Sequence, residues 1–327
     1  PTRARFWFGA AFSGDGEYQL SLDAEGVADI HGNTNTPWAG AFRLDTRGPQ
    51  VVSASLASGE MLAPGVHEIT FTFNEDLDTT YLDAGGFLLY EAFANQFVTI
   101  GDFDYAAATR TLTLTTPALG EGSYVLSLLP GFYGLKDLLG NPLDGNADGI
   151  AGDSYTLAFD VDLDTAAYPP MQPLSPLGSL VYDPLIAGAM QGTGDVDTYT
   201  VSLDAGQRLT VVVDALPPDL QIQVAVIDAD DDSVVALLDG VAGEGIVMQG
   251  LGGLSGDYRI ALTSLAGSGH YDFALVLNAL LEAEMLVGGA TNDSIATATA
   301  LEPGSLLVGA AGASRMAVVG ERDQQIG

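Results

Sequence analysis

The sequence predicts an all-β protein built from β-sandwich domains arranged in tandem. Three observations carry this prediction. The chain has 327 residues, about twice the usual size of a single domain. Its apolar residues occur in short runs interrupted by Gly, Asp, Asn and Pro, as in strands joined by turns. A pattern of strand, turn and strand occurs twice in the first half of the chain, which indicates a repeated unit.

The repeated pattern is a strand of the form G-x-Y-x-L-S-L, a D-x-x-G-N turn and a closing strand that begins with Ala-Phe. The first copy begins with GEYQLSL at Gly16 and the second with GSYVLSL at Gly122. Further predicted strands precede the second copy only. We therefore expect residues 1–48 to be the C-terminal part of one domain and residues 49–168 to be a complete domain.

Within residues 49–168, apolar and polar residues alternate in short segments such as VHEITFTF and TRTLTLT, separated by turn signals at the spacing of a sandwich. Together with FTFNEDLD, GEGSYVLSL and KDLLGNPLDG, these segments resemble the bacterial Ig-like domains that occur in tandem in surface-layer and other cell-surface proteins. The resemblance implies Ig-like β-sandwiches with a structural or adhesive role outside the cell.

A Pro-rich stretch at residues 169–177 is predicted to be a linker, because clustered Pro favours extended spacers. Residues 178–279 follow with a different pattern, D-x-D-x-Y-x-V-x-L-x-A-G-Q from Asp195. This stretch resembles the bacterial pre-peptidase C-terminal domain, a small jelly-roll-like β-sandwich that accompanies secreted proteases and also occurs in surface proteins. Residues 280–327 are predicted to hold a linker and the start of a further, truncated β-domain.

The chain is strongly acidic, with a formal net charge of −33. A surface of this sign repels phosphate backbones and anionic lipids, so we expect no nucleic-acid partner. No apolar stretch reaches the roughly 18 residues of a membrane-spanning helix, so no membrane insertion is expected in this segment. Asp outnumbers Glu by 31 to 12. Asp suits both turns and calcium sites, but a solubilising surface or adaptation to a salty environment explains the excess equally well.

The stretch LGNPLDGNADGIAGDSY contains the main candidate calcium site. Its acidic and amide side chains alternate before Gly149, like the opening of a calcium loop. An EF-hand is excluded, because the twelfth position is Tyr155 and the flanking segments alternate like strands. The alternative is a metal-free turn in which Asp and Asn cap backbone amides. The candidate Ca²⁺ ligands are Asp144, Asn146, Asp148, the carbonyl of Ile150, and Asp153.

The acidic run VIDADDDSV is a weaker calcium candidate, placed where two strands should turn. Carboxylates this close repel one another unless water or a cation separates them. The alternative is a solvated hairpin tip. The candidate ligands are Asp228, Asp230 and Asp232.

Asp195 and Asp197 precede Tyr199 in the D-x-D-x-Y stretch. Side chains two residues apart in a strand point to the same face of the sheet. We expect these carboxylates to have a structural hydrogen-bonding role.

No catalytic site is predicted. The chain has no Cys, and it lacks a nucleophile elbow, a zinc-protease helix motif and a phosphate-binding loop. His31, His67 and His270 are scattered along the sequence without partner motifs. We expect a protein without enzymatic activity in this segment.

These observations predict a structural or adhesive segment of a large extracellular or cell-surface bacterial protein, a rod of sandwiches that calcium would stiffen. Its expected partners are other domains of the same long chain or other surface proteins, including self-association. The alternative is an accessory region of a secreted hydrolase such as a protease, with a secretion or substrate-binding role. A carbohydrate- or protein-binding module would require an exposed aromatic platform, and the only tryptophans are Trp7 and Trp38.

Overall fold

The protein is all-β, as predicted. The structure is a computed structural model and describes residues 8, 9, 12, 14–173, 182, 185–214, 216–282, 306–308, 313–315 and 317–319. In these ranges the regular structure is β-strand, apart from one 3-10 turn, η1 (Ala84–Gly86). No helix in the described part of the chain is long and apolar enough to cross a membrane.

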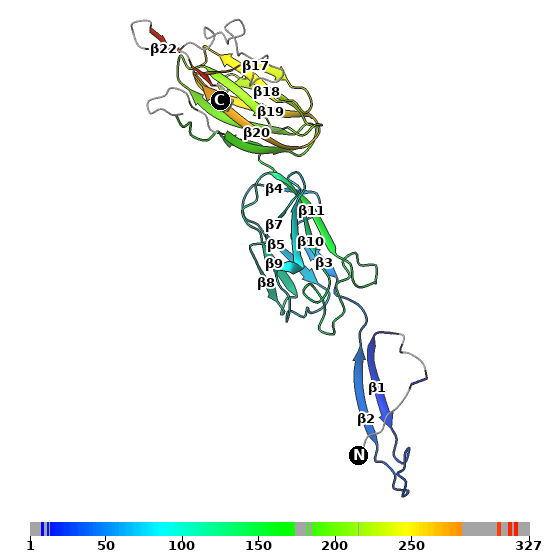
Figure 1. The fold of residues 1–327 in the computed structure, drawn as a ribbon. Coiled ribbons are helices and arrows are strands. Elements are labelled where there is room, and N and C mark those ends of the chain that lie inside the picture. Colours follow the sequence, from blue (N-terminus) through cyan, green and yellow to red (C-terminus); the bar gives the residue numbers. More distant parts are fainter. Residues whose placement is uncertain are drawn as a thin grey trace, which may run out of the picture.

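The described N-terminal part is a hairpin of two strands, β1 (Gly16–Leu22) and β2 (Trp38–Leu44). They pair antiparallel over seven residues, from Gly16 opposite Leu44 to Leu22 opposite Trp38. The hairpin and two larger units follow one another along the chain (Figure 1).

The first β-sandwich consists of two sheets around one core. The strand orders are β4-β11-β10-β6-β7 and β3-β5-β9-β8. Only β4 and β11 pair in parallel, and the other neighbours in these two sheets are antiparallel. The strands are β3 (Val51–Ala54), β4 (Glu60–Leu62), β5 (Glu68–Phe73), β6 (Phe87–Glu91), β7 (Gln96–Val98), β8 (Asp102–Ala106), β9 (Thr111–Thr115), β10 (Gly122–Leu128) and β11 (Tyr155–Val161).

Alternation along these strands explains the core of the first sandwich. In β9, Leu112 and Leu114 are fully buried while the Thr residues between them are only half-buried. In β10 the buried positions likewise alternate, and Leu126 and Leu128 face inward. Because successive side chains of a strand point to opposite faces, each sheet presents one apolar face to the other.

The second β-sandwich has a five-stranded sheet, β12-β14-β19-β16-β17, and a four-stranded sheet, β13-β20-β15-β18. Its core includes Tyr199, Ile260 and Phe273. The strands are β12 (Thr165–Ala167), β13 (Leu185–Met190), β14 (Val196–Leu203), β15 (Leu209–Asp214), β16 (Gln221–Asp228), β17 (Val234–Asp239), β18 (Ile246–Leu251), β19 (Gly256–Ala266) and β20 (Gly269–Leu277). Two sandwiches in series agree with the predicted tandem fold class.

The segment that connects the two sandwiches is short and precedes the Pro-rich stretch that the sequence predicts to be the linker. Strand β11 ends at Val161 and β12 begins at Thr165. Tyr168 is buried in the second core, and its hydroxyl accepts a hydrogen bond from the amide of Leu275 (2.7 Å). Residues 165–168 therefore belong physically to the second sandwich, and only residues 162–164 connect the two units.

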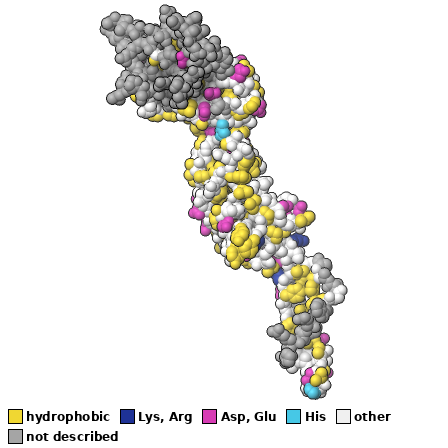
Figure 2. Space-filling model, in the orientation of Figure 1, with side chains coloured by type: hydrophobic (Ala, Val, Ile, Leu, Met, Phe, Trp, Pro, Cys, Tyr) yellow, Lys and Arg dark blue, Asp and Glu magenta, His cyan; other side chains and the backbone are white. Residues whose placement is uncertain are grey.

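The predicted further domain at residues 280–327 lies mostly outside the described residues. Within it, β21 (Leu280–Leu281) pairs in parallel with β24 (Val318–Val319), and β22 (Leu306–Val308) pairs with β23 (Ala313–Arg315). Figure 2 shows acidic side chains dispersed over the described parts of one face, with few basic ones among them.

Candidate functional site

Three groups of carboxylates in the described part of the chain bring their oxygens within 4.8 Å of one another. One of them contains Asp45, Glu75 and Asp137. Burial raises the pKa of Glu75, the neighbouring acids raise it further, and Arg43 and Arg110 oppose the shift. The second group is in the predicted calcium loop, and the third lies between the sandwiches.

The predicted calcium loop closes around Asp144, which is 2 % exposed. One oxygen of this carboxylate accepts hydrogen bonds from the side chain of Gln50 (2.6 Å) and the amide of Gly149 (2.9 Å). The other accepts from the amide of Asp148 (3.1 Å). Gly149 has a φ of 89°, a left-handed conformation that favours Gly. The loop thus satisfies the buried carboxylate with protein donors.

The other predicted ligands of this loop also meet backbone amides. Asn146 accepts from the amide of Asp148 (2.9 Å), and Asp148 accepts from the amide of Ile150 (2.8 Å). Asp153 accepts from the amide of Gly145. Asp144, Asp148 and Asp153 do converge. The geometry therefore fits both the calcium loop and the metal-free turn, and calcium binding here stays a prediction.

The acidic run at the β16–β17 turn is also engaged in local hydrogen bonds. Asp228 accepts from the amide of Asp230 (2.9 Å), and Asp232 is paired with Arg259. The hydrogen bonds from Ser233 lower the pKa of Asp231. The run is not among the three converging groups of the described residues, and its metal binding likewise stays a prediction.

The third group lies where the two sandwiches meet. Asp162 follows β11 of the first sandwich, Asp195 precedes β14 of the second, and Asp197 lies within β14. Asp162 is 8 % exposed and Asp197 is completely buried. Acidic side chains are seldom this deeply buried, and two of them converging with the half-buried Asp195 is an unusual polar feature of the described structure.

Direct hydrogen bonds cross this junction. Glu121, which precedes β10, accepts a hydrogen bond from the amide of Ala189 in β13 (2.8 Å). In the opposite direction, the side-chain amide of Gln191 donates to the carbonyl of Val161 (2.9 Å). Both bonds link backbone of one sandwich to a side chain of the other, so they fix the mutual position of the two units.

The acidic groups at the junction raise one another's pKa. Burial is the largest cause for all three shifted carboxyls: it raises the pKa of Asp197 to about 8, of Glu121 to about 7 and of Asp162 to about 6. Repulsion from neighbouring acids adds to each shift. His270 opposes the shift at Glu121, and its ring lies 3.4 Å from Glu91.

Asp197 also anchors a buried chain of hydroxyls. Its Oδ2 accepts from the hydroxyl of Tyr271 (2.6 Å), which lies 2.7 Å from the hydroxyl of Tyr199. Burial raises the pKa of both tyrosines far above its ordinary value. The hydrogen-bonding role expected for Asp197 is therefore confirmed. The sequence interpretation missed Glu121, Asp162 and Gln191, because no motif connects them to the D-x-D-x-Y stretch.

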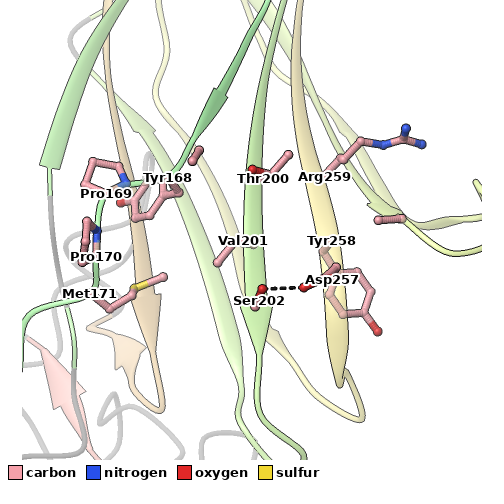
Figure 3. A pocket seen from close by; sticks show the side chains of 12 residues that line it. Tyr168, Pro169, Pro170, Met171, Thr200, Val201, Ser202, Asp257, Tyr258 and Arg259 are labelled. Carbon is pink, nitrogen blue, oxygen red and sulfur yellow. Dashed lines mark hydrogen bonds between the residues drawn. The ribbon is translucent and has the colours of Figure 1, made fainter.

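A pocket of about 580 Å³ lies on the second sandwich beside Tyr168 and Pro169 (Figure 3). Two polar residues of its lining are joined by a hydrogen bond: the hydroxyl of Ser202 donates to the carboxylate of Asp257. No histidine, lysine or cysteine lines the pocket. A serine nucleophile needs an adjacent base to accept its proton. A carboxylate such as that of Asp257 is a weak base for this purpose. The pocket does not present an acyl-transfer site.

Comparison with known families identifies the first sandwich. Residues 45–163 match the family model of the bacterial Ig-like domain. This bacterial Ig-like match covers about a third of the chain and confirms the resemblance inferred for that region. The family is a non-catalytic domain family. The pre-peptidase C-terminal resemblance of the second sandwich is not confirmed and stays a prediction, and no curated protein matches the chain.

Several solved structures are weakly similar to parts of the chain. CopC from Methylosinus trichosporium OB3b is 19% identical, with a TM-score of 0.26 over 35% of this chain and 93% of that one. The N-terminal part of the bacterial S-layer protein SbsC is 10% identical, with a TM-score of 0.24 over 59% of this chain and 43% of that one. The secreted serine protease VesC from Vibrio cholerae is 12% identical, with a TM-score of 0.20 over 66% of this chain and 47% of that one. TM-scores this low support no inference about function.

Proposed function

We propose that this chain is a non-catalytic structural or adhesive segment of a large extracellular or cell-surface bacterial protein. In this proposal the sandwiches act as stiff units in series. Its partners are other domains of the same long protein or other surface proteins, including further copies of this chain. The bacterial Ig-like match of residues 45–163 supports this role.

The observation that carries the proposal is the junction between the sandwiches. Only residues 162–164 separate β11 from β12, and hydrogen bonds of Glu121 and Gln191 cross the boundary. A short connection with direct contacts restricts the relative motion of two domains, whereas long linkers permit it. Stiffness transmits force and holds binding surfaces at a fixed distance from a cell.

Because the chain has no Cys, an introduced pair of cysteines can be labelled without side reactions. We expect spin labels at Ala108→Cys and Ala242→Cys, one on each sandwich, to give one narrow distance distribution by electron–electron double resonance. Both positions are exposed. A matched control carries the same labels and a Gly-Ser insertion after Leu163, and its distribution should broaden. A distribution in the native chain as broad as that of the insertion variant would contradict the rod.

The second candidate function is an accessory region of a secreted hydrolase. It is favoured by the D-x-D-x-Y resemblance of the second sandwich to the pre-peptidase C-terminal domain. In that case the chain should bind insoluble protein or polysaccharide, and co-sedimentation would detect it. The groove beside Tyr168 and Tyr258 is the natural place to test, with Tyr258→Ala as the variant.

A further inference from the structure

We propose that the junction between the two sandwiches binds one divalent cation of the calcium type. Asp162 of the first sandwich and Asp195 and Asp197 of the second would be its carboxylate ligands, with Glu121 at the rim. The site deepens the proposed function. Calcium binding itself does not depend on the proposed function. Only its expected consequence, a stiffer junction, rests on that function.

The spacing of the carboxylates fits one ion. Calcium binds oxygen ligands at about 2.3–2.6 Å, so two oxygens on opposite sides of an ion are about 5 Å apart. One oxygen each from Asp162, Asp195 and Asp197 lies within 4.8 Å of the others. A single cation can therefore contact all three without a change of fold.

Two buried acceptors at the junction have no donor among the residues that the structure describes. The first is Oδ1 of Asp197, a residue that is 0% exposed. The second is Oε1 of Gln191, whose amide nitrogen is held by the carbonyl of Val161. Buried polar atoms almost always have a partner. Oε1 of Gln191 can only accept, and Oδ1 of Asp197 can only accept while its carboxyl is ionised, so the partner that would satisfy both is a cation or a proton donor.

The charge of the surroundings favours a cation. Glu121, Asp162, Asp195 and Asp197 lie close enough to repel one another. Among the described residues, the basic side chain that acts on this group is His270, which is also beside Glu91. Within the described part of the chain, no Lys or Arg forms a salt bridge with any of the four acids. A buried acidic group without a counter-charge is costly, and a hard divalent cation is the partner that oxygen ligands select.

The junction differs in this respect from the Asp144 loop. There both oxygens of the buried Asp144 accept hydrogen bonds from protein donors, so that loop is satisfied without metal. Glu121, at the rim of the proposed site, also lines a cleft. This cleft, of about 300 Å³ between the sandwiches, is lined by Glu121 and Tyr124 on one side and Gly188 and His270 on the other.

The test is calcium titration of the full chain after treatment with chelator, measured by isothermal titration calorimetry at neutral pH. Asp162→Asn and Asp197→Asn keep the shape of the side chain and remove one charged ligand from either sandwich. Each variant should bind one calcium ion fewer than the native chain. The double variant should also bind one ion fewer and not two. Asp148→Asn, in the Asp144 loop, is the matched control and should keep the ion at the junction. Circular dichroism reports whether each variant folds.

Thermal melting supplies a readout that a purely structural role of Asp197 would not produce. In chelator, Asp197→Asn should melt no lower than the native chain, because the Asn side-chain oxygen can still accept from Tyr271 and carries no charge for the neighbouring acids to repel. In calcium it should melt lower, because the native chain alone gains from the ion. An unaltered calcium stoichiometry in both junction variants would overturn the site. So would a native chain that binds no calcium and carries only protons on these carboxyls.

The spin-label distances separate this inference from the proposed function. One outcome is that calcium binding is lost in the junction variants while the native chain shows a broad distance distribution in calcium. This outcome would support the metal site and contradict the rigid rod. A narrow distribution in a chain that binds no calcium would support the rod and overturn the site.

Discussion

The β1–β2 hairpin and the β10–β11 pair are two copies of one sequence pattern in different surroundings. In both, a seven-residue antiparallel register begins at the Gly of G-x-Y-x-L-S-L. In both, the Tyr hydroxyl donates to the carbonyl four residues earlier: 2.6 Å for Tyr18 and 2.9 Å for Tyr124. The Tyr ring stacks on the Phe opposite, with ring centres 5.3 Å apart for Phe42 and 5.6 Å for Phe159.

The D-x-x-G-N turns of the two copies are just as similar. Asp29 accepts hydrogen bonds from the amide and the side chain of Asn33 (2.9 and 2.8 Å). Asp137 accepts the same two bonds from Asn141 (both 2.8 Å). The local pattern therefore sets the register and the turn in either place, without help from distant residues.

What differs is burial. Phe159 is 1 % exposed and Tyr124 is 4 % exposed, because the sheet β3-β5-β9-β8 covers them. Among the described residues, β1 and β2 form a sheet of their own, and Phe42 and Tyr18 are only half-buried. The comparison shows that identical local hydrogen bonds should carry different energies, because burial decides what their loss costs.

The largest difference is expected for the Phe residues. Phe159→Ala should lower the free energy of unfolding of the first sandwich by about 3–5 kcal/mol, because it leaves a cavity in a packed core. Phe42→Ala should leave that unfolding transition unchanged. Urea denaturation followed by tyrosine fluorescence measures both. Equal losses in the two variants would mean that the first copy is as deeply packed as the second.

The turn carboxylates should differ next. Asp137 is 2 % exposed, so Asp137→Ala leaves the partly buried hydrogen bonds from the amides of Leu139 and Asn141 without their acceptor and should cost about 1–3 kcal/mol. Asp29→Ala exposes its donors to water and should not move the sandwich transition. Urea denaturation of each variant against the native chain tests this, with Asp137→Asn as the conservative control. A cost at Asp29 equal to that at Asp137 would contradict the role of burial.

A smaller difference is expected for the tyrosine hydroxyls. Tyr124→Phe removes the partner of the Gly120 carbonyl and should cost about 0.5–1.5 kcal/mol. Tyr18 is only half-buried and lies outside the core that contains Tyr124, so Tyr18→Phe should not move the sandwich transition. Thermal melting of the paired variants provides the measurement. A larger effect at Tyr18 would show that the hairpin depends on this bond more than the sandwich does.

The smallest effect concerns pH. The hydrogen bonds from Asn33, first from its side chain and then from its amide, lower the pKa of Asp29 below 3.8. A lowered pKa stabilises the folded turn above the unfolded value, and this contribution is lost as the pH falls through the folded pKa. The amide signals of His31 and Asn33 in an acid titration should therefore move with a midpoint below 3.8. In Asn33→Ala the midpoint should rise, and an unchanged midpoint would exclude this cause.

Around the Pro-rich stretch, the sequence does not predict which residues join the second sandwich. Clustered Pro at residues 169–177 predicts an extended spacer. The composition does not indicate that β12, which directly precedes this stretch, pairs with β14. The sequence places Tyr168 at the end of the predicted first domain, residues 49–168, yet it lies in the second core. Which side of a boundary a residue joins depends on pairing with strands far along the chain, and local composition does not contain that information.

The sequence by itself determined the strands, the repeated hairpin and its turns, because alternation, Asp-x-x-Gly-Asn hydrogen bonding and cross-strand stacking act between residues that are close in the chain or directly paired. Only the tertiary structure decided that Asp162 and Asp197 meet. Each looks like an ordinary acid of an acidic protein in the sequence. They become a buried acidic cluster because two separate sandwiches pack end to end and shield both side chains from water.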